Sequence, residues 1–208
     1  MTAVAEIAGF LAARAAARGV PVDRALVESA ALLHDLDKAL PETDPLRRMG
    51  HGHAGAAWLV ERDLAELAPA VDNHPVMRLT GPGAEAWLQR STIEERIVAY
   101  ADKRAAQRLA PLDARFRRWF ERHPEHADGL RQARERAAEL EREICEAADV
   151  DPADVARLRW VRSAFDAAET DRADLQAIAA AAAGRPAPGG HAGVAGPAEP
   201  TRSGGSTP

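Results

Sequence analysis

The sequence predicts an all-helical protein. Alanine dominates the 46% of residues that are hydrophobic, and aromatic residues account for only 4%. Runs of β-branched and aromatic residues, which are typical of strands, are almost absent. Apolar residues instead recur at helical spacing from the beginning of the chain, as at Val4, Ile7, Leu11 and Ala15. We therefore expect a helical bundle around one core.

The first two predicted helices lead to an unusual pair of residues. The opening helix ends at Gly19, and a corner follows before Asp23, which is a candidate N-cap for the second helix. The apolar stripe of that second helix ends abruptly at His34 and Asp35. Buried imidazoles and carboxylates are costly unless they are paired or bind a metal ion. This pair is therefore the first candidate for a functional site.

The next stretch is predicted to contain two shorter helices. Residues 41–50 form a polar loop, and a helix opens at His51 and runs to Val60. A short helix over residues 65–73 ends at His74, because the residue before a proline disfavours helical geometry. A turn is predicted at residues 80–83.

A longer helix is predicted over about residues 93–109. Ser91 and Thr92, each with a glutamate three residues later, form two overlapping candidate capping boxes. Asp102 then lies in the middle of this helix beside an apolar stripe. A carboxylate in that position needs a cation or a hydrogen-bonded partner.

The second half of the chain is helical in pattern but has no motif of recognisable chemistry. Helices are predicted over residues 111–120 and 129–148, and Asp151-Pro152 begins another that extends to about residue 169. A last alanine-rich helix ends near Gly184. We expect a core at residues 1–110, a helical extension at residues 111–184 and a disordered Gly/Pro/Ala-rich tail at residues 185–208.

The composition of the chain indicates which binding partners and which cellular compartment to expect. The net charge of -5 argues against binding to a nucleic-acid polymer, although it leaves a nucleotide substrate open. A single cysteine, Cys145, excludes an intramolecular disulfide and fits a reducing compartment. No apolar run is long enough to span a membrane, and no signal peptide is recognisable at the N-terminus. We expect a cytoplasmic protein.

Five residues are candidate metal ligands: His34, Asp35, His51, His74 and Asp102. Adjacent side chains such as His34 and Asp35 lie about 100° apart on a helix, so both can reach one ion near the helix end. Imidazole and carboxylate together suit Fe, Mn, Ni, Co or Zn, as one ion or two. With two ions, Asp35 is the natural bridge, and His51 and His74 would complete the second site.

Basic residues near these ligands are candidates for binding an anionic substrate. Lys38 lies on the same side as Asp35 and would face a substrate phosphate. Arg78 and Arg104 are further candidate contacts, because a guanidinium fork matches phosphate. His53 is an alternative to His51 and another candidate for substrate contact.

Structural explanations remain open for several of these residues. His74 could simply interact with the carbonyl groups at a helix end. Asp102 could pair with Arg104 or Lys38 without any metal ion. Asp37 and Lys38 could belong to a solvated turn.

Taken in order, these motifs resemble the HD-domain metal-dependent phosphohydrolases. The resemblance covers about residues 1–110. It implies a helical bundle and catalysis in which a hydroxide formed at the metal, with Asp35 and Lys38 as catalytic residues, attacks a phosphate ester or anhydride of a nucleotide or another small phosphorylated molecule. The number and order of histidines are similar to those of binuclear members, including enzymes that cleave symmetric diadenosine tetraphosphate. The matching stretches are Ala31-Leu32-Leu33-His34-Asp35-Leu36-Asp37-Lys38, His51 with Gly55-Ala56, His74, and Tyr100-Ala101-Asp102-Lys103-Arg104.

One element of the family pattern is missing. The family's first metal-binding histidine lies four residues before a Val-Ala pair, which here is Val4-Ala5, so it would directly precede Met1. Either the ligand is lacking or the start codon is misassigned, and we expect the second. The resemblance leaves two rival functions open, a di-iron oxygenase of the same fold and a degenerate module for ligand sensing or protein interaction. The C-terminal helices could cover the site, set specificity or form a homodimer.

Overall fold

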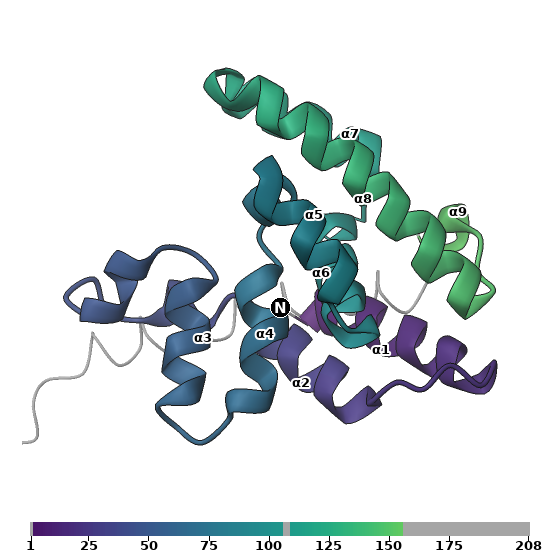
Figure 1. Cartoon of the computed structure of the whole chain (residues 1–208), viewed down its shortest axis with the longest axis horizontal. Helices are drawn as coiled ribbons and strands as arrows, with labels where there is room; N and C mark the ends of the chain where they lie inside the picture. Colours follow the sequence, from purple (N-terminus) through teal and green to yellow (C-terminus); the bar gives the residue numbers. More distant parts are fainter. Residues whose placement is uncertain (1, 106–108, 156–208) are drawn as a thin grey trace, which may run out of the picture. The chain divides into compact units, whose positions relative to one another are not determined.

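The computed structural model describes residues 2–105 and 109–155, which form helices joined by short turns (Figure 1). Within these ranges the backbone forms no β-strand, only an isolated bridge between Ala105 and Leu109. The predicted all-helical class is confirmed. The predictions for the residue before Met1, for the helices beyond residue 155 and for the tail lie outside the described residues.

Two N-terminal helices form one side of the core. Helix α1 (Thr2–Ala17) packs against α2 (Arg24–Leu33), and its predicted apolar face is buried, with Ile7 and Leu11 fully inaccessible. Asp23 caps α2 as predicted, because its side chain accepts a hydrogen bond of 3.0 Å from the Leu26 backbone N–H. Helix α2 ends at Leu33, with His34 as its C-cap.

The next helices are short and are separated by 3₁₀ turns. Helix α3 begins at His53 rather than at the predicted His51. Gly52 explains the difference: its φ is +84°, and a Cβ there would lie only 2.8 Å from Pro75 Cγ. His51 therefore precedes the helix. The segments of this region are 3₁₀ turns η1 (Leu36–Ala39), η2 (Pro45–Met49), η3 (Ala65–Leu67) and η4 (Val76–Leu79), and helices α3 (His53–Val60) and α4 (Ala68–Asn73).

The predicted turn at residues 80–83 is the beginning of a helix, α5 (Gly81–Arg90). Pro82 is compatible with the first helical turn, where its missing N–H costs no hydrogen bond. Trp87 is buried, and its indole N–H donates to Glu95 Oε2 at 3.0 Å. This tertiary contact stabilises a helix whose first residues resemble a turn in the sequence.

Helix α6 (Ile93–Arg104) lies at the centre of the fold and contacts α1, α2, α4, α7 and α8 (Figure 1). The predicted capping box of Thr92 and Glu95 is present. The helix ends at Arg104, earlier than the predicted end at Leu109. The reason is a reversal of the chain: the Ala110 N–H donates to the Arg104 carbonyl, and Arg104 Nε donates to the Ala110 carbonyl.

The C-terminal elements pack on this core. Helix α8 extends along α7 and reaches α1 and α6 (Figure 1). Its apolar face is buried, including Leu130, Leu140 and Ile144. None of the described helices is both long and apolar enough to cross a bilayer. The elements are α7 (Leu112–Arg122), η5 (Pro124–His126), α8 (Ala127–Ala148) and α9 (Pro152–Val155).

The described residues all belong to one compact unit. The sequence-based boundaries of a core, an extension and a tail stay predictions.

A polar network joins α6 to α8. Arg104 is 2% exposed and forms an ion pair with Glu141, and its guanidinium also donates to the Tyr100 hydroxyl. Arg104 Nη2 donates to the Pro152 carbonyl at 2.8 Å. Arg104 therefore connects four segments of the chain and uses its donors within the fold.

Replacing Arg104 with methionine is expected to destabilise the protein by about 2–3 kcal/mol, because it leaves the Glu141 carboxylate and two carbonyls without their partner. Urea unfolding followed by circular dichroism measures the change. Arg131→Met is the control, since Arg131 forms an exposed ion pair with Asp128, and we expect little or no change. Equal stability of both variants would contradict this role of Arg104.

Candidate metal centre

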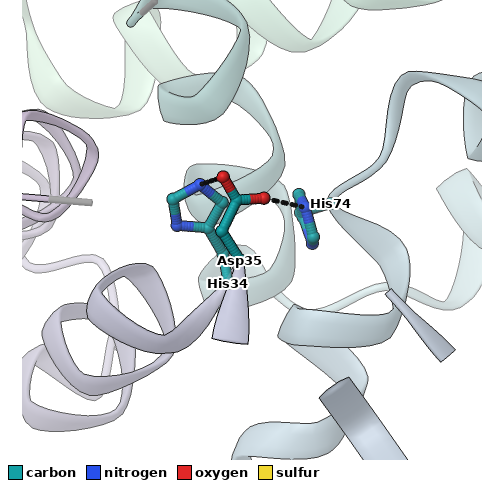
Figure 2. Close-up of side chains that lie close together, drawn as sticks. All are labelled: His34, Asp35 and His74. Carbon is teal, nitrogen blue, oxygen red and sulfur yellow. Dashed lines mark ion pairs between the residues drawn. The ribbon is translucent and has the colours of Figure 1, made fainter. Parts of the chain in front are cut away.

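Helix ends bring the predicted ligands together, and Asp102 is also near a helix end rather than in mid-helix as predicted. His34 follows α2, His74 follows α4, and Asp35 begins the turn η1. Asp102 lies in the last turn of α6. Figure 2 shows the carboxylate of Asp35 between the imidazoles of His34 and His74. Segments far apart in the sequence thus converge on one carboxylate.

The Nδ1 atom of each clustered histidine has a fixed acceptor. His34 Nδ1 lies 2.7 Å from the Ala31 carbonyl oxygen, and His74 Nδ1 lies 2.6 Å from the Val71 carbonyl oxygen. A carbonyl oxygen only accepts, so both Nδ1 atoms carry the proton and donate it. His51 Nδ1 likewise faces Asp37 Oδ2 at 2.9 Å. In the neutral rings, the Nε2 atoms therefore keep free lone pairs.

These Nε2 lone pairs point at one another and at carboxylate oxygens. His74 Nε2 lies 3.1 Å from His51 Nε2. His34 Nε2 lies 3.5 Å from Asp35 Oδ2 and 3.6 Å from Asp102 Oδ1. Burial lowers the pKa of His34, although the charges of Asp102 and Asp35 oppose this effect. The result is a cluster of acceptors that requires a cation, either protons or a metal ion, at its centre.

Asp35 is the shared member of the cluster. Its Oδ1 atom is buried and lacks a hydrogen bond of good geometry, although the Lys38 ammonium forms an ion pair with it at 2.6 Å. His51 Nε2 and His74 Nε2 lie 3.5 and 3.7 Å from the same oxygen. Burial opposes ionisation, but His74, His34 and Lys38 together hold the pKa of the carboxyl well below its usual range. Asp35 is therefore a negative charge available to a cation.

The donor set fits a divalent transition metal. His34, Asp35 and His74 each place one ligand atom within 4.8 Å of the others, and Asp35, Asp37 and His51 form a second such group. Both groups contain Asp35, so a carboxylate bridge between two ions is compatible with the geometry. Imidazole nitrogen with carboxylate oxygen is the ligand chemistry of Fe, Mn, Ni, Co and Zn.

Asp37 is a member of the site that the sequence did not reveal. It is 7% exposed, whereas a solvated turn was the alternative for this residue. By accepting from His51 Nδ1 it fixes the orientation of that ring, as carboxylates commonly do for metal-binding histidines. The sequence spacing of Asp37 and His51 does not predict their contact, because a loop separates the two residues.

Lys103 is a second residue that sequence reasoning missed. It is fully buried, and its Nζ donates to the His74 carbonyl at 2.8 Å and to the Ala99 carbonyl at 2.9 Å. Burial lowers its pKa to about 8, opposed by the charge of Asp102. Lys103 thus holds the backbone of His74 against α6, next to Asp102.

Three of the predicted substrate contacts are engaged outside the cluster. His53 and Arg78 both contact Asp72, and Arg78 Nε also donates to the Asp72 carbonyl. Arg104 is occupied by Glu141. Of the four, the structure brings only Lys38 to the ligand cluster.

The alternatives left open for Asp102 and His74 have different outcomes. Asp102 pairs with neither Arg104 nor Lys38, because its ion pair is with His34. His74 does contact a carbonyl of its own helix, but it does so through Nδ1 while Nε2 remains directed at Asp35. The helix-end contact and the cluster thus use different atoms of one ring.

The family model described as HD domain matches residues 1–107 of the chain. That range contains all five predicted ligands as well as Asp37 and Lys103. No curated protein and no solved structure matches the chain.

Replacing Lys103 with methionine is expected to weaken Mn²⁺ affinity by about tenfold to a hundredfold, the usual cost of losing a group that positions a ligand. Isothermal titration calorimetry on the metal-free chain measures it, with Arg131→Met as a control that alters an exposed cation on α8, in an ion pair with Asp128. An unchanged affinity in Lys103→Met would contradict the positioning role.

Asp37→Ala distinguishes an orienting residue from a ligand. We expect the metal stoichiometry to stay as in the wild type and the affinity to fall by about tenfold to a hundredfold, because His51 loses its acceptor. Elemental analysis after dialysis against excess Mn²⁺ gives the ions per chain. Loss of one ion per chain would contradict this assignment and make Asp37 a ligand.

Proposed function

The chain belongs to the HD-domain superfamily, whose members are generally metal-dependent hydrolases, and from this premise we propose that it hydrolyses a phosphate ester or anhydride. The substrate would be a nucleotide or another small phosphorylated molecule. The observation that carries the proposal is the convergence of histidine Nε2 atoms on Asp35, with their Nδ1 protons held elsewhere.

The residues of the cluster would hold one or two divalent transition metal ions. His34, Asp35 and Asp102 would bind the first ion, and His51 and His74 would bind a second that shares Asp35. When bound, such an ion supplies the Lewis acidity that activates water and stabilises charge on a phosphoryl oxygen. The protein's own contribution is the fixed orientation of five ligands before the ion arrives, which lowers the cost of ordering them.

Lys38 would bind the substrate in this proposal. Its side chain is 60% exposed, yet its ammonium lies 2.6 Å from Asp35 Oδ1, so it stands at the solvent side of the shared carboxylate. A phosphoryl group that approaches the cluster from solvent meets this positive charge. Lys38 would then exchange Asp35 for a phosphate oxygen.

Hydrolysis of phosphorylated compounds, followed by phosphate release and by chromatography of the nucleotide products, is the experiment for this proposal. The full chain, loaded separately with Mn, Fe, Ni, Co or Zn, is assayed on p-nitrophenyl phosphate, nucleotides and dinucleoside polyphosphates. We expect turnover with at least one metal, and Asp35→Asn should reduce it by more than about a hundredfold, because loss of a ligand exceeds the cost of losing an outer contact. Asp128→Asn, at an exposed position on α8, is the matched control.

Two results would contradict the proposal in different ways. Oxygen consumption by the iron-loaded chain, with a mixed-valent iron pair seen by electron paramagnetic resonance and no hydrolysis of any phosphorylated compound, would favour the oxygenase alternative. A chain that binds no metal and keeps its fold would favour a non-catalytic module.

A further inference from the structure

Helix α7 carries an arginine beside the metal centre. Arg115 lies in the first half of α7, outside residues 1–107, the range that the family model matches. Helix α7 contacts α6, the helix of Asp102 and Lys103. Among the charges that act on Arg115, Asp102 is the strongest favourable one, and Asp35 also contributes. The guanidinium therefore lies in the electrostatic field of two proposed metal ligands.

The Arg115 guanidinium has no polar partner within the described part of the chain. Its Nε–H donor is buried and has no hydrogen-bond acceptor, and no described carboxylate forms an ion pair with the guanidinium. A buried N–H group without an acceptor costs folding free energy, so an acceptor supplied by a ligand would stabilise it. The guanidinium stacks on Trp119, with its carbon atom 4.7 Å from the ring centroid.

Positive charges near Arg115 would also favour a bound anion. Burial lowers the pKa of Arg115, and the positive charges of Arg118 and Arg122 act in the same direction against Asp102. These three arginines follow one another at helical spacing on α7. By contrast, Arg78 is paired with Asp72 and Arg104 with Glu141. Of the described guanidinium groups of Arg78, Arg104 and Arg115, that of Arg115 is the one with a buried donor that lacks an acceptor.

We propose that Arg115 binds a phosphoryl oxygen of the substrate held at the metal centre. The proposal rests on the proposed function and adds to it a substrate contact from the C-terminal helices. The charges of Asp102 and Asp35 act on Arg115, and none of the described ion pairs joins Arg115 to either carboxylate. A guanidinium fork fixed against Trp119 suits two oxygens of one phosphoryl group.

The role of α7 follows from this contact. The matched domain supplies the metal ligands and Lys38, and α7 supplies a second cationic contact from another direction. Lys38 and Arg115 would then hold the same phosphoryl group from two elements, which restricts its orientation at the cluster. Substrates without an anionic group at this position would lose the Arg115 contact.

Binding of inorganic phosphate to the Mn²⁺-loaded full chain tests the proposal, with isothermal titration calorimetry as the readout. Arg115→Ala should weaken phosphate binding by about tenfold to a hundredfold, the usual worth of hydrogen bonds to a charged group, and leave the Mn²⁺ content unchanged. Arg115→Lys keeps the positive charge without the guanidinium fork, so its phosphate affinity should lie between those of the wild type and Arg115→Ala. Arg117→Ala, at an exposed position of the same helix, is the control and should bind phosphate like the wild type.

Phosphate affinity equal to the wild type in Arg115→Ala would overturn the proposal. If that variant does not fold, Arg115→Lys decides: a weakened affinity supports the contact, and a wild-type affinity overturns it. The readout is independent of turnover. A wild-type chain that binds phosphate through Arg115 but hydrolyses none of the substrates contradicts the proposed function alone, whereas turnover with no effect of Arg115 contradicts this inference alone.

Discussion

The metal centre depends on the hydrogen bonds that hold the Nδ1 protons of its histidines. In His34 and His74 the acceptor is the carbonyl three residues earlier, Ala31 and Val71, so each ring is tied to the end of the helix that carries it. With that proton fixed, Nε2 is left as an acceptor and is directed at Asp35. A cation is needed because acceptors that face one another repel in a buried site. The fold contributes to this arrangement by placing the C-terminal ends of α2 and α4 next to each other.

Other parts of the fold maintain this arrangement. Lys103 donates to the backbone of His74, and Asp37 orients the ring of His51, so both residues are held in place. Helix α6 connects these contacts to the C-terminal helices through Arg104, which pairs with Glu141. The described part of the extension, residues 111–155, thus packs against the helices that carry the site, and Arg115 gives it a chemical role as well.

Much of the fold was predictable because its signals are local. The cap at Asp23, the capping box at Thr92 and the apolar stripe of α8 each depend on residues a few positions apart. Helix α5 and the early end of α6 were missed, since Trp87 is stabilised by Glu95 and Arg104 by Ala110 after the chain has turned back. The sequence likewise indicated which residues could bind a metal, but not that Arg78 and Arg104 pair elsewhere. Those pairs, and the contact of Asp37 with His51, exist only in three dimensions.

The most direct test of the account is the tautomer of the clustered histidines. Long-range ¹H–¹⁵N correlation spectra of the metal-free, histidine-labelled chain at mildly alkaline pH distinguish Nδ1–H from Nε2–H rings, and single His→Gln variants assign the signals. We predict the Nδ1–H form for His34, His51 and His74, with their Nε2 signals alone shifting strongly when Zn²⁺ is added. Protons on Nε2 in these rings, or Nε2 signals that do not respond to Zn²⁺, would contradict the central claim.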